Sequence, residues 1–293
     1  MPMPYFQSEG IACFAHRGGA ACWPENTLEA FRGGLAAGCP WIETDVHMTR
    51  DGHIVCHHDH DLRRTSDAAG KIWDHSLSEL RRVDAGYRFT PDGHSYPFRG
   101  RGLTIPTLEE VAALDPAARI NLEIKQANPP MIRALWQQIE ALGLHDRVLV
   151  ASADASLVRA FRALARGAVA SSAGRAEIFA FWLAARAGLS SRLPIDYEAL
   201  QVPTGFRGLE VVTAPFVEAA HRRGLQVHVW TIDDVEVMRR LIELGVDGIM
   251  TDQPRRLAKL VRELGLMPEV GIAEQLGTAP APAPDDQDTA PSS

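Results

Sequence analysis

Three acidic side chains lie in short apolar runs, where charged groups are costly to bury. Glu43 and Asp45 are two residues apart in the run 41–46, so in a strand their side chains share one face. Glu123 occupies the matching place in the run 119–125. Three neighbouring carboxylates cannot all ionise without a cation or raised pKa values. Carboxylate oxygens suit hard ions, so the pattern predicts a site for one divalent cation, Mg²⁺ or Ca²⁺.

Two histidines could carry protons beside these carboxylates. His16 ends the run 11–16, and His58 precedes Asp59 in the sequence CHHDHD. Imidazole titrates near neutral pH, which suits it to proton transfer in enzymes. One histidine at a strand end is usually a packing or capping residue, but two beside a carboxylate cluster favour general acid and base catalysis.

Cationic and aromatic groups follow the same runs. Arg17 and Lys125 could bind a phosphate, the arginine through its two-pronged guanidinium. Trp230 is either an apolar wall for the carbon skeleton of a substrate or a core residue.

The sequence PENT opens a predicted helix and has two interpretations. Asn26 or Thr27 can cap the first turn of that helix. Glu25 and Asn26 could also brace His16 and the arginine that follows it.

The sequence CHHDHD also contains potential zinc ligands, Cys56, His57, His58 and His60. Alternation along a strand puts Cys56 and His58 on one face and His57 on the other, so they do not converge. The chain has no G-x-S-x-G motif, no Walker loop and no convincing pairing of cysteine with histidine. Serine hydrolases, nucleotide-hydrolysing P-loop enzymes and thiol hydrolases are therefore disfavoured.

Apolar runs alternate with helical patterns along most of the chain. The eight runs that predict strands are 11–16, 41–46, 119–125, 147–152, 167–171, 198–203, 225–230 and 246–251. This alternation predicts an α/β fold, a TIM-type (β/α)8 barrel, whose active site lies at the carboxyl ends of the strands. A doubly wound open sheet is the alternative, but no glycine-rich dinucleotide-binding motif follows the first strand.

Two segments depart from the alternation. Asp51-Gly52 predicts a hairpin with a returning strand at 53–58, and the connection to about Pro106 is too long for a simple strand-to-helix loop. We therefore expect one barrel unit over residues 1–268 with a small insertion at about 50–106. Residues 269–293 are rich in Ala, Pro and Asp, and we expect a disordered tail there.

Composition excludes several classes of protein. The chain has 293 residues, of which 46% are hydrophobic, and a net charge of −7, which argues against a nucleic-acid partner. Its four cysteines form no CxxC pair, so we expect reduced thiols. No signal peptide and no membrane-spanning run is recognisable, which predicts a cytoplasmic protein without stable membrane insertion.

Several motifs together resemble the glycerophosphodiester phosphodiesterase family in order and spacing. They are AHRGG with PENTLEAF, IETDVHMTRDGHIVCHHDHDLRRTS, IPTLEE, INLEIK, VHVWTIDD and GVDGIMTDQP. The match runs from about Ile11 to Leu264, with a weak part between 155 and 205. The resemblance implies a TIM-type barrel that hydrolyses small-molecule glycerophosphodiesters to sn-glycerol 3-phosphate and an alcohol, using a divalent metal.

The same resemblance implies roles for individual residues. It implies metal ligation by Glu43, Asp45 and Glu123, general acid and base catalysis by His16 and His58, phosphate binding by Arg17 and Lys125, and contact with the glycerol by Trp230. Glu25, Asn26 and Asp59 would hold the catalytic and phosphate-binding side chains in position without touching the substrate. The insertion would match the extra subdomain of the family.

Two other functions remain open at this point. The apolar stretch 177–189 suits an acyl chain if one face is exposed, which would favour a lysophospholipase D-like activity on the same fold. A buried amphipathic helix explains that stretch equally well. A barrel that binds phosphoesters without catalysis is the other alternative, although a binder would not need paired proton carriers.

Overall fold

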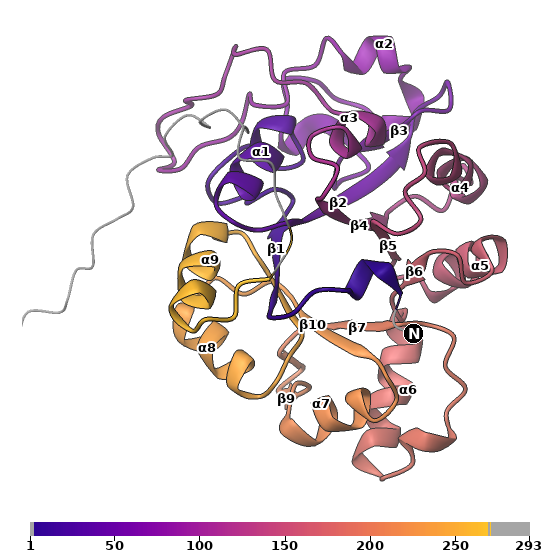
Figure 1. The fold of residues 1–293 in the computed structure, drawn as a ribbon. Coiled ribbons are helices and arrows are strands. Elements are labelled where there is room, and N and C mark those ends of the chain that lie inside the picture. The colour runs from indigo at the N-terminus through magenta and orange to yellow at the C-terminus, as the bar shows by residue number, and fades with distance from the viewer. Residues whose placement is uncertain (1–2, 269, 271–293) are drawn as a thin grey trace, which may run out of the picture.

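Residues 3–268 and 270 are described by the computed structural model, in which eight parallel strands form one nearly closed barrel (Figure 1). Around the barrel the strands follow the order β6-β5-β4-β2-β1-β11-β10-β7. A parallel bridge between Ser172 and Ala199 joins the two ends of this order. The strands are β1 (Ala12–His16), β2 (Trp41–Met48), β4 (Arg119–Ile124), β5 (Val148–Ala151), β6 (Ala170–Ser171), β7 (Ala199–Val202), β10 (Gln226–Val229) and β11 (Gly248–Thr251). The predicted TIM-type fold is confirmed.

Helices surround the strands and cover their outer faces (Figure 1). They are α1 (Leu28–Ala36), α3 (Leu108–Ala112), α4 (Ile132–Ala141), α5 (Ala155–Ala165), α6 (Arg175–Arg186), α7 (Ala214–His221), α8 (Val235–Glu243) and α9 (Pro254–Glu263). Several of these helices have a capping side chain at the N-terminus. At the start of α1, Thr27 accepts a hydrogen bond from the Ala30 amide, and at the start of α8, Asp234 accepts one from the Val237 amide. Apolar side chains between helices and strands form the core of the molecule.

The segment between β2 and α3 is a compact addition to the barrel. It contains β3 (Ile54–Cys56), α2 (Leu77–Leu80) and two short 3₁₀ turns, η2 (Leu62–Arg64) and η3 (Ile72–Asp74). Its own small core consists of Val55, Leu62, Ile72, Leu80, Val83, Ala85 and Ile105. Because β3 pairs antiparallel with the end of β2, β2 extends to Met48, two residues beyond the predicted strand.

A second hairpin was not predicted. The strands β8 (Gly205–Phe206) and β9 (Leu209–Glu210) pair antiparallel after β7. Arg207 and Gly208, at φ 50° and φ 80°, form the two-residue connection. Positive φ at both central residues is the geometry that closes tight hairpins. Strands this short leave no periodic signal in the sequence.

Two further 3₁₀ turns are η1 (Pro4–Phe6) and η4 (Ser190–Arg192). All four cysteines are free, as predicted. None of the helices within the described part of the chain is long and apolar enough to cross a membrane. The predicted tail at 269–293 lies, apart from Val270, outside the described residues.

Candidate active site

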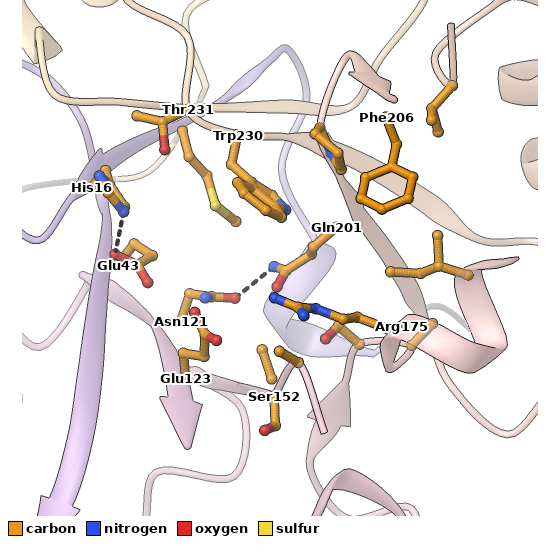
Figure 2. Close-up of a pocket in the computed structure, with 18 of the residues that line it drawn as sticks. His16, Glu43, Asn121, Glu123, Ser152, Arg175, Gln201, Phe206, Trp230 and Thr231 are labelled. Atoms are coloured by element: carbon orange, nitrogen blue, oxygen red, sulfur yellow. Dashed lines mark hydrogen bonds and ion pairs between the residues drawn. The ribbon is translucent and has the colours of Figure 1, made fainter. Parts of the chain in front are cut away.

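The ends of the barrel strands surround a cavity of about 560 Å³. Figure 2 shows His16, Glu43, Glu123 and Trp230 around this space. Arg17, His58 and Lys125 also line it. The structure therefore brings together residues that lie far apart in the sequence, at the end of the barrel where the fold predicts the active site.

The three predicted carboxylates form one cluster. Glu43, Asp45 and Glu123 each place an oxygen within 4.8 Å of the others, and they are the one such group of potential metal ligands in the described part of the chain. Sheet register explains the proximity, because Asp45 pairs with Glu123 across β2 and β4. Glu43 and Asp45 are buried, and Glu123 is partly exposed. Three converging oxygen ligands fit a hard divalent cation.

Charge is distributed unevenly within the cluster. Burial and the neighbouring Asp45 carboxylate raise the pKa of Glu43 to about 7. Burial also favours neutral Asp45, but Lys125 and Arg17 outweigh it and lower the pKa of Asp45 to about 2. Lys125 Nζ lies 3.1 Å from Asp45 and 2.9 Å from Glu123. Two cations therefore offset part of the negative charge, and Glu43 is the carboxyl that they leave least compensated.

His16 is held between two carboxylates. Its Nδ1 lies 2.7 Å from Asp252 Oδ1, and its Nε2 lies 3.8 Å from Glu43 Oε2. Burial lowers the pKa of His16, but Glu43 and Asp252 outweigh that effect and the pKa is raised overall. Asp252 was missed by the sequence reasoning, although it directly follows the strand run 246–251. Asp233 in turn accepts a hydrogen bond from the Asp252 amide at 2.8 Å.

The turn after β1 explains the two glycines that follow His16. Arg17, Gly18 and Gly19 all have positive φ, at 52°, 89° and 106°. A Cβ on Gly18 would lie 2.6 Å from the Cβ of Ala30 in α1, so only glycine fits. The turn directs the Arg17 amide toward Glu43 Oε2, to which it donates a hydrogen bond at 3.0 Å.

A chain of polar contacts supports Arg17 and His58. Glu25 accepts a hydrogen bond from Arg17 at 3.1 Å and binds both terminal nitrogens of Arg64. Arg64 Nε also binds Asp59, whose other oxygen lies 2.6 Å from His58 Nδ1. Burial raises the pKa of Asp59, but Arg64 and His58 outweigh it and bring that pKa to about 2. Arg64 was not predicted as a site residue.

Asn26 contacts the carboxylate cluster rather than His16. Its side-chain nitrogen donates to Asp45 Oδ2 at 3.0 Å, and its oxygen accepts a hydrogen bond from Thr44 at 2.6 Å. Thr27, and not Asn26, is the helix cap. His57 turns away from the cavity toward the backbone of Asp59 and the hydroxyl of Thr65. This orientation agrees with the argument against a zinc site.

The remaining wall of the cavity is largely apolar. Trp230 lines it and is partly exposed, so it belongs to the cavity rather than to the core. Ile178, Phe179 and Trp182 from α6 lie on the same wall, as do Phe206 and Leu209 from the β8–β9 hairpin. The sequence left open whether the stretch 177–189 is a buried helix or exposes an apolar face. The structure shows some of each, because Phe181 is buried whereas Phe179, Leu183 and Leu189 are exposed.

Two amides lie on the floor of the cavity. Gln201 from β7 donates to Asn121 Oδ1 from β4 at 2.7 Å (Figure 2). The same Gln201 nitrogen lies 3.3 Å from His228 Nδ1. Burial lowers the pKa of His228 to about 3, so this ring stays neutral near pH 7. Neither amide was predicted as a site residue, since only the closed barrel brings β4 and β7 together.

Comparisons with known proteins agree with this architecture. Residues 16–256 match the model of the glycerophosphoryl diester phosphodiesterase family. A Mycobacterium tuberculosis protein named "Probable glycerophosphodiester phosphodiesterase 2" is 34% identical over 266 residues, covering 89% of this chain and 92% of its own. The glycerophosphodiester phosphodiesterase of Caldanaerobacter subterraneus is 32% identical over 257 residues, with coverage of 86% and 98%.

A solved structure is also similar. The phosphodiesterase of Oleispira antarctica, determined in complex with the product sn-glycerol-3-phosphate, superposes with a TM-score of 0.70 at 25% identity. The similarity covers 88% of this chain and 99% of that one. The chain therefore belongs to the glycerophosphoryl diester phosphodiesterase family, and the family resemblance seen in its motifs is confirmed.

Proposed function

We propose that this protein is a metal-dependent phosphodiesterase that hydrolyses glycerophosphodiesters to sn-glycerol 3-phosphate and an alcohol. One observation carries the proposal: two histidines, Arg17 and Lys125 line one cavity together with two carboxylates of the acidic cluster, and the third carboxylate, Asp45, lies within 4.8 Å of those two. The names of its relatives and the product bound to the Oleispira antarctica enzyme support the same reaction. Residues 1–268 form the catalytic unit in this proposal, and the insertion at about 50–106 supplies His58 and its supporting residues.

Glu43, Asp45 and Glu123 would hold one divalent cation, Mg²⁺ or Ca²⁺. The raised pKa of Glu43 supports this assignment, because a buried carboxyl so crowded by negative charge gains a compensating partner when a cation binds. Such an ion, when bound, withdraws electron density from the phosphoryl group and offsets its negative charge.

The remaining steps belong to side chains of the chain itself. Arg17 and Lys125 bind the phosphate oxygens and stabilise the charge that develops on them. One histidine takes a proton from the attacking hydroxyl, and the other gives a proton to the leaving alkoxide. Asp252 orients His16 and Asp59 orients His58, each through Nδ1, which leaves Nε2 for the substrate. The attacking group is water, or the 2-hydroxyl of the glycerol through a cyclic phosphate.

An activity assay tests the proposal. Purified protein is given glycerophosphocholine or glycerophosphoethanolamine with Mg²⁺, Ca²⁺ or EDTA, and glycerol 3-phosphate is measured. We expect release with a divalent cation and none with EDTA. Equal release with EDTA contradicts the metal assignment, and no release from either diester with any cation contradicts the substrate assignment.

A second candidate function is hydrolysis of lysophospholipids in the manner of a lysophospholipase D. The apolar wall formed by Phe179, Trp182, Phe206 and Leu209 favours it, because an acyl chain could lie there while the phosphate reaches the carboxylates. Lysophosphatidylcholine, assayed alongside the two diesters, distinguishes the candidates through release of choline. A non-catalytic phosphoester binder is disfavoured, since simple binding does not require two oriented histidines.

A further inference from the structure

Four large apolar side chains at the mouth of the cavity are exposed. Phe206 is 62% exposed, Phe179 60%, Leu209 55% and Trp230 41%, and all four line the same cavity. Soluble proteins seldom expose apolar side chains in such a group, and where they do the group usually marks a binding surface. We call Phe179, Phe206, Leu209 and Trp230 the apolar rim.

The local structure holds the apolar rim outward. Phe206 and Leu209 are paired across the β8–β9 hairpin, so their side chains share one face of it. Arg207 and Gly208 close that hairpin in a tight turn with positive φ. Phe179 stacks on Trp182 of α6, with the two ring centroids 6.2 Å apart. In Figure 2, Phe206 lies across the cavity from His16 and Glu43.

Three exposed arginines accompany the apolar rim. Arg207 lies over the ring of Phe206 at 5.3 Å, and Arg186 lies over Trp182 at 4.9 Å. Arg175 lines the cavity from the start of α6. Within the described residues none of these three guanidinium groups forms an ion pair. Glu177, two residues after Arg175, is paired with Arg162, and Glu210, three residues after Arg207, is exposed at the end of the hairpin. The face is therefore locally cationic on a chain whose net charge is −7.

We propose that the apolar rim and these three arginines dock the protein reversibly on an anionic lipid surface, with the cavity opening toward the lipid. Aromatic side chains beside arginines are the composition that interfacial membrane binding requires. A protein partner seated on this face would close the mouth of the cavity, whereas a lipid surface would present lysophospholipids, the substrates of the second candidate function, to that mouth. The inference rests on the proposed function in one respect, that diester hydrolysis takes place in the cavity that faces the lipid.

Vesicle co-sedimentation of the full chain tests the docking. The probes are vesicles of phosphatidylcholine alone and vesicles that also contain phosphatidylglycerol. We expect binding to the anionic vesicles, weakened by salt. Arg207→Glu should lower the partition coefficient about fivefold or more, because each cation near an anionic surface adds roughly that factor. The double variant Phe206→Ser/Leu209→Ser should lower it more than about tenfold, through loss of apolar burial.

Two controls match these variants. Arg166 is exposed and has φ 49°, close to that of Arg207, but it follows α5 at the opposite end of the barrel. Leu264 is 38% exposed after α9 at that same opposite end. Arg166→Glu and Leu264→Ser should bind vesicles like the unmodified chain. Circular dichroism and thermal unfolding verify that every variant is folded.

Three outcomes overturn the docking proposal. They are no binding of the unmodified chain to anionic vesicles, equal loss in the control variants, and a dimer in solution that the Phe206→Ser/Leu209→Ser change dissociates. The last result assigns the apolar rim to a second copy of the chain. Diester hydrolysis is measured separately without lipid, so vesicle binding by a protein that releases no glycerol 3-phosphate removes the proposed function and leaves the docking.

Discussion

Arg64 binds the carboxylate of Glu25 through both terminal nitrogens, at 2.6 and 2.7 Å, and so connects the insertion to the turn after β1. Glu25 continues to Arg17, and Arg64 continues through Asp59 to His58. The proposed phosphate-binding arginine and one proposed proton carrier therefore share one set of ionic contacts. Arg17 and His58 lie at the two ends of this series of contacts. They are therefore fixed relative to each other, although they come from different parts of the fold.

Arg64→Ala should lower kcat/KM for glycerophosphocholine about 10- to 100-fold, the usual cost of losing a residue that orients active-site groups. Glu25 would lose its bidentate partner, and Asp59 would no longer be held against His58. The neighbouring Arg63, which is exposed and pairs only with Asp61 among the described residues, is the matched control. Equal activity of Arg64→Ala and Arg63→Ala would show that the connection is not needed for catalysis.

His16→Ala and His58→Ala should each lower kcat roughly 10²- to 10⁴-fold, since each removes one proton carrier. The double variant should lose less than the product of the two effects, because groups that act in one step are not additive. Initial rates with saturating metal measure the effect. His53→Ala, at an exposed position of the β2–β3 hairpin, should stay close to the unmodified rate. Near-normal turnover by His58→Ala would refute its assignment.

Glu123→Gln should weaken binding of the divalent cation about tenfold or more, because one charged ligand becomes neutral. Isothermal titration calorimetry with Mg²⁺ and with Ca²⁺ measures this change directly. The fold should persist, since Glu123 is partly exposed and its main contact is Lys125. Glu109→Gln, an exposed carboxylate on α3, is the control. Unchanged affinity in Glu123→Gln would remove Glu123 from the ligand set.

His228 predicts how stability depends on pH. Its pKa is about 3 in the folded protein, through burial, against about 6.5 in an unfolded chain. The unfolded state therefore binds the extra proton, so this contribution to stability is full above about pH 6.5 and declines as pH falls toward 3. The slope should reach at most about 1.4 kcal/mol per pH unit.

Urea unfolding between neutral and acid pH measures that slope. His228→Gln should flatten it while lowering stability at neutral pH, because the ring loses its contact with Phe14, whose centroid is 4.9 Å away. His94→Gln, at an exposed position, should keep the slope of the unmodified chain. An unchanged slope in His228→Gln would mean that another group takes up the proton.

The sequence predicted those parts of the site that depend on local periodicity. Alternation along a strand placed Glu43 and Asp45 on one face, and strand register then brought Glu123 beside them. The end of a strand run likewise identified His16. Such signals are contained in a few consecutive residues, whereas the place of Glu123 beside the other two carboxylates also depends on the pairing of β2 with β4.

Other parts of the site depend on distant segments. Arg64 meets Glu25 across 39 positions, and Gln201 meets Asn121 across 80, so neither pair has a local pattern. The β8–β9 hairpin has two-residue strands, which are too short for alternation to identify. Asp252 differs from these, because its place after a strand run gave a usable signal.

The amide pair on the cavity floor leads to a last prediction. Gln201 uses its nitrogen toward Asn121 and His228, so its oxygen and the Asn121 nitrogen remain as one acceptor and one donor. If both amides were turned over and His228 donated instead, one donor and one acceptor would still remain. This pair suits a hydroxyl group of the substrate, which both donates and accepts.

Gln201→Leu should therefore raise KM for glycerophosphocholine and lower kcat/KM by about tenfold, through loss of orienting hydrogen bonds and the unpaired Asn121 oxygen that results. Gln201→Glu separates the loss of the orienting hydrogen bond from the loss of the donor to Asn121. Its carboxylate still accepts a hydrogen bond from the substrate, but it cannot donate to the Asn121 oxygen. Gln137→Leu on the exposed face of α4 is the control. The interpretation requires the loss to appear with metal affinity unchanged by calorimetry. A parallel loss of metal binding would instead mean that the amides act through the neighbouring Glu123.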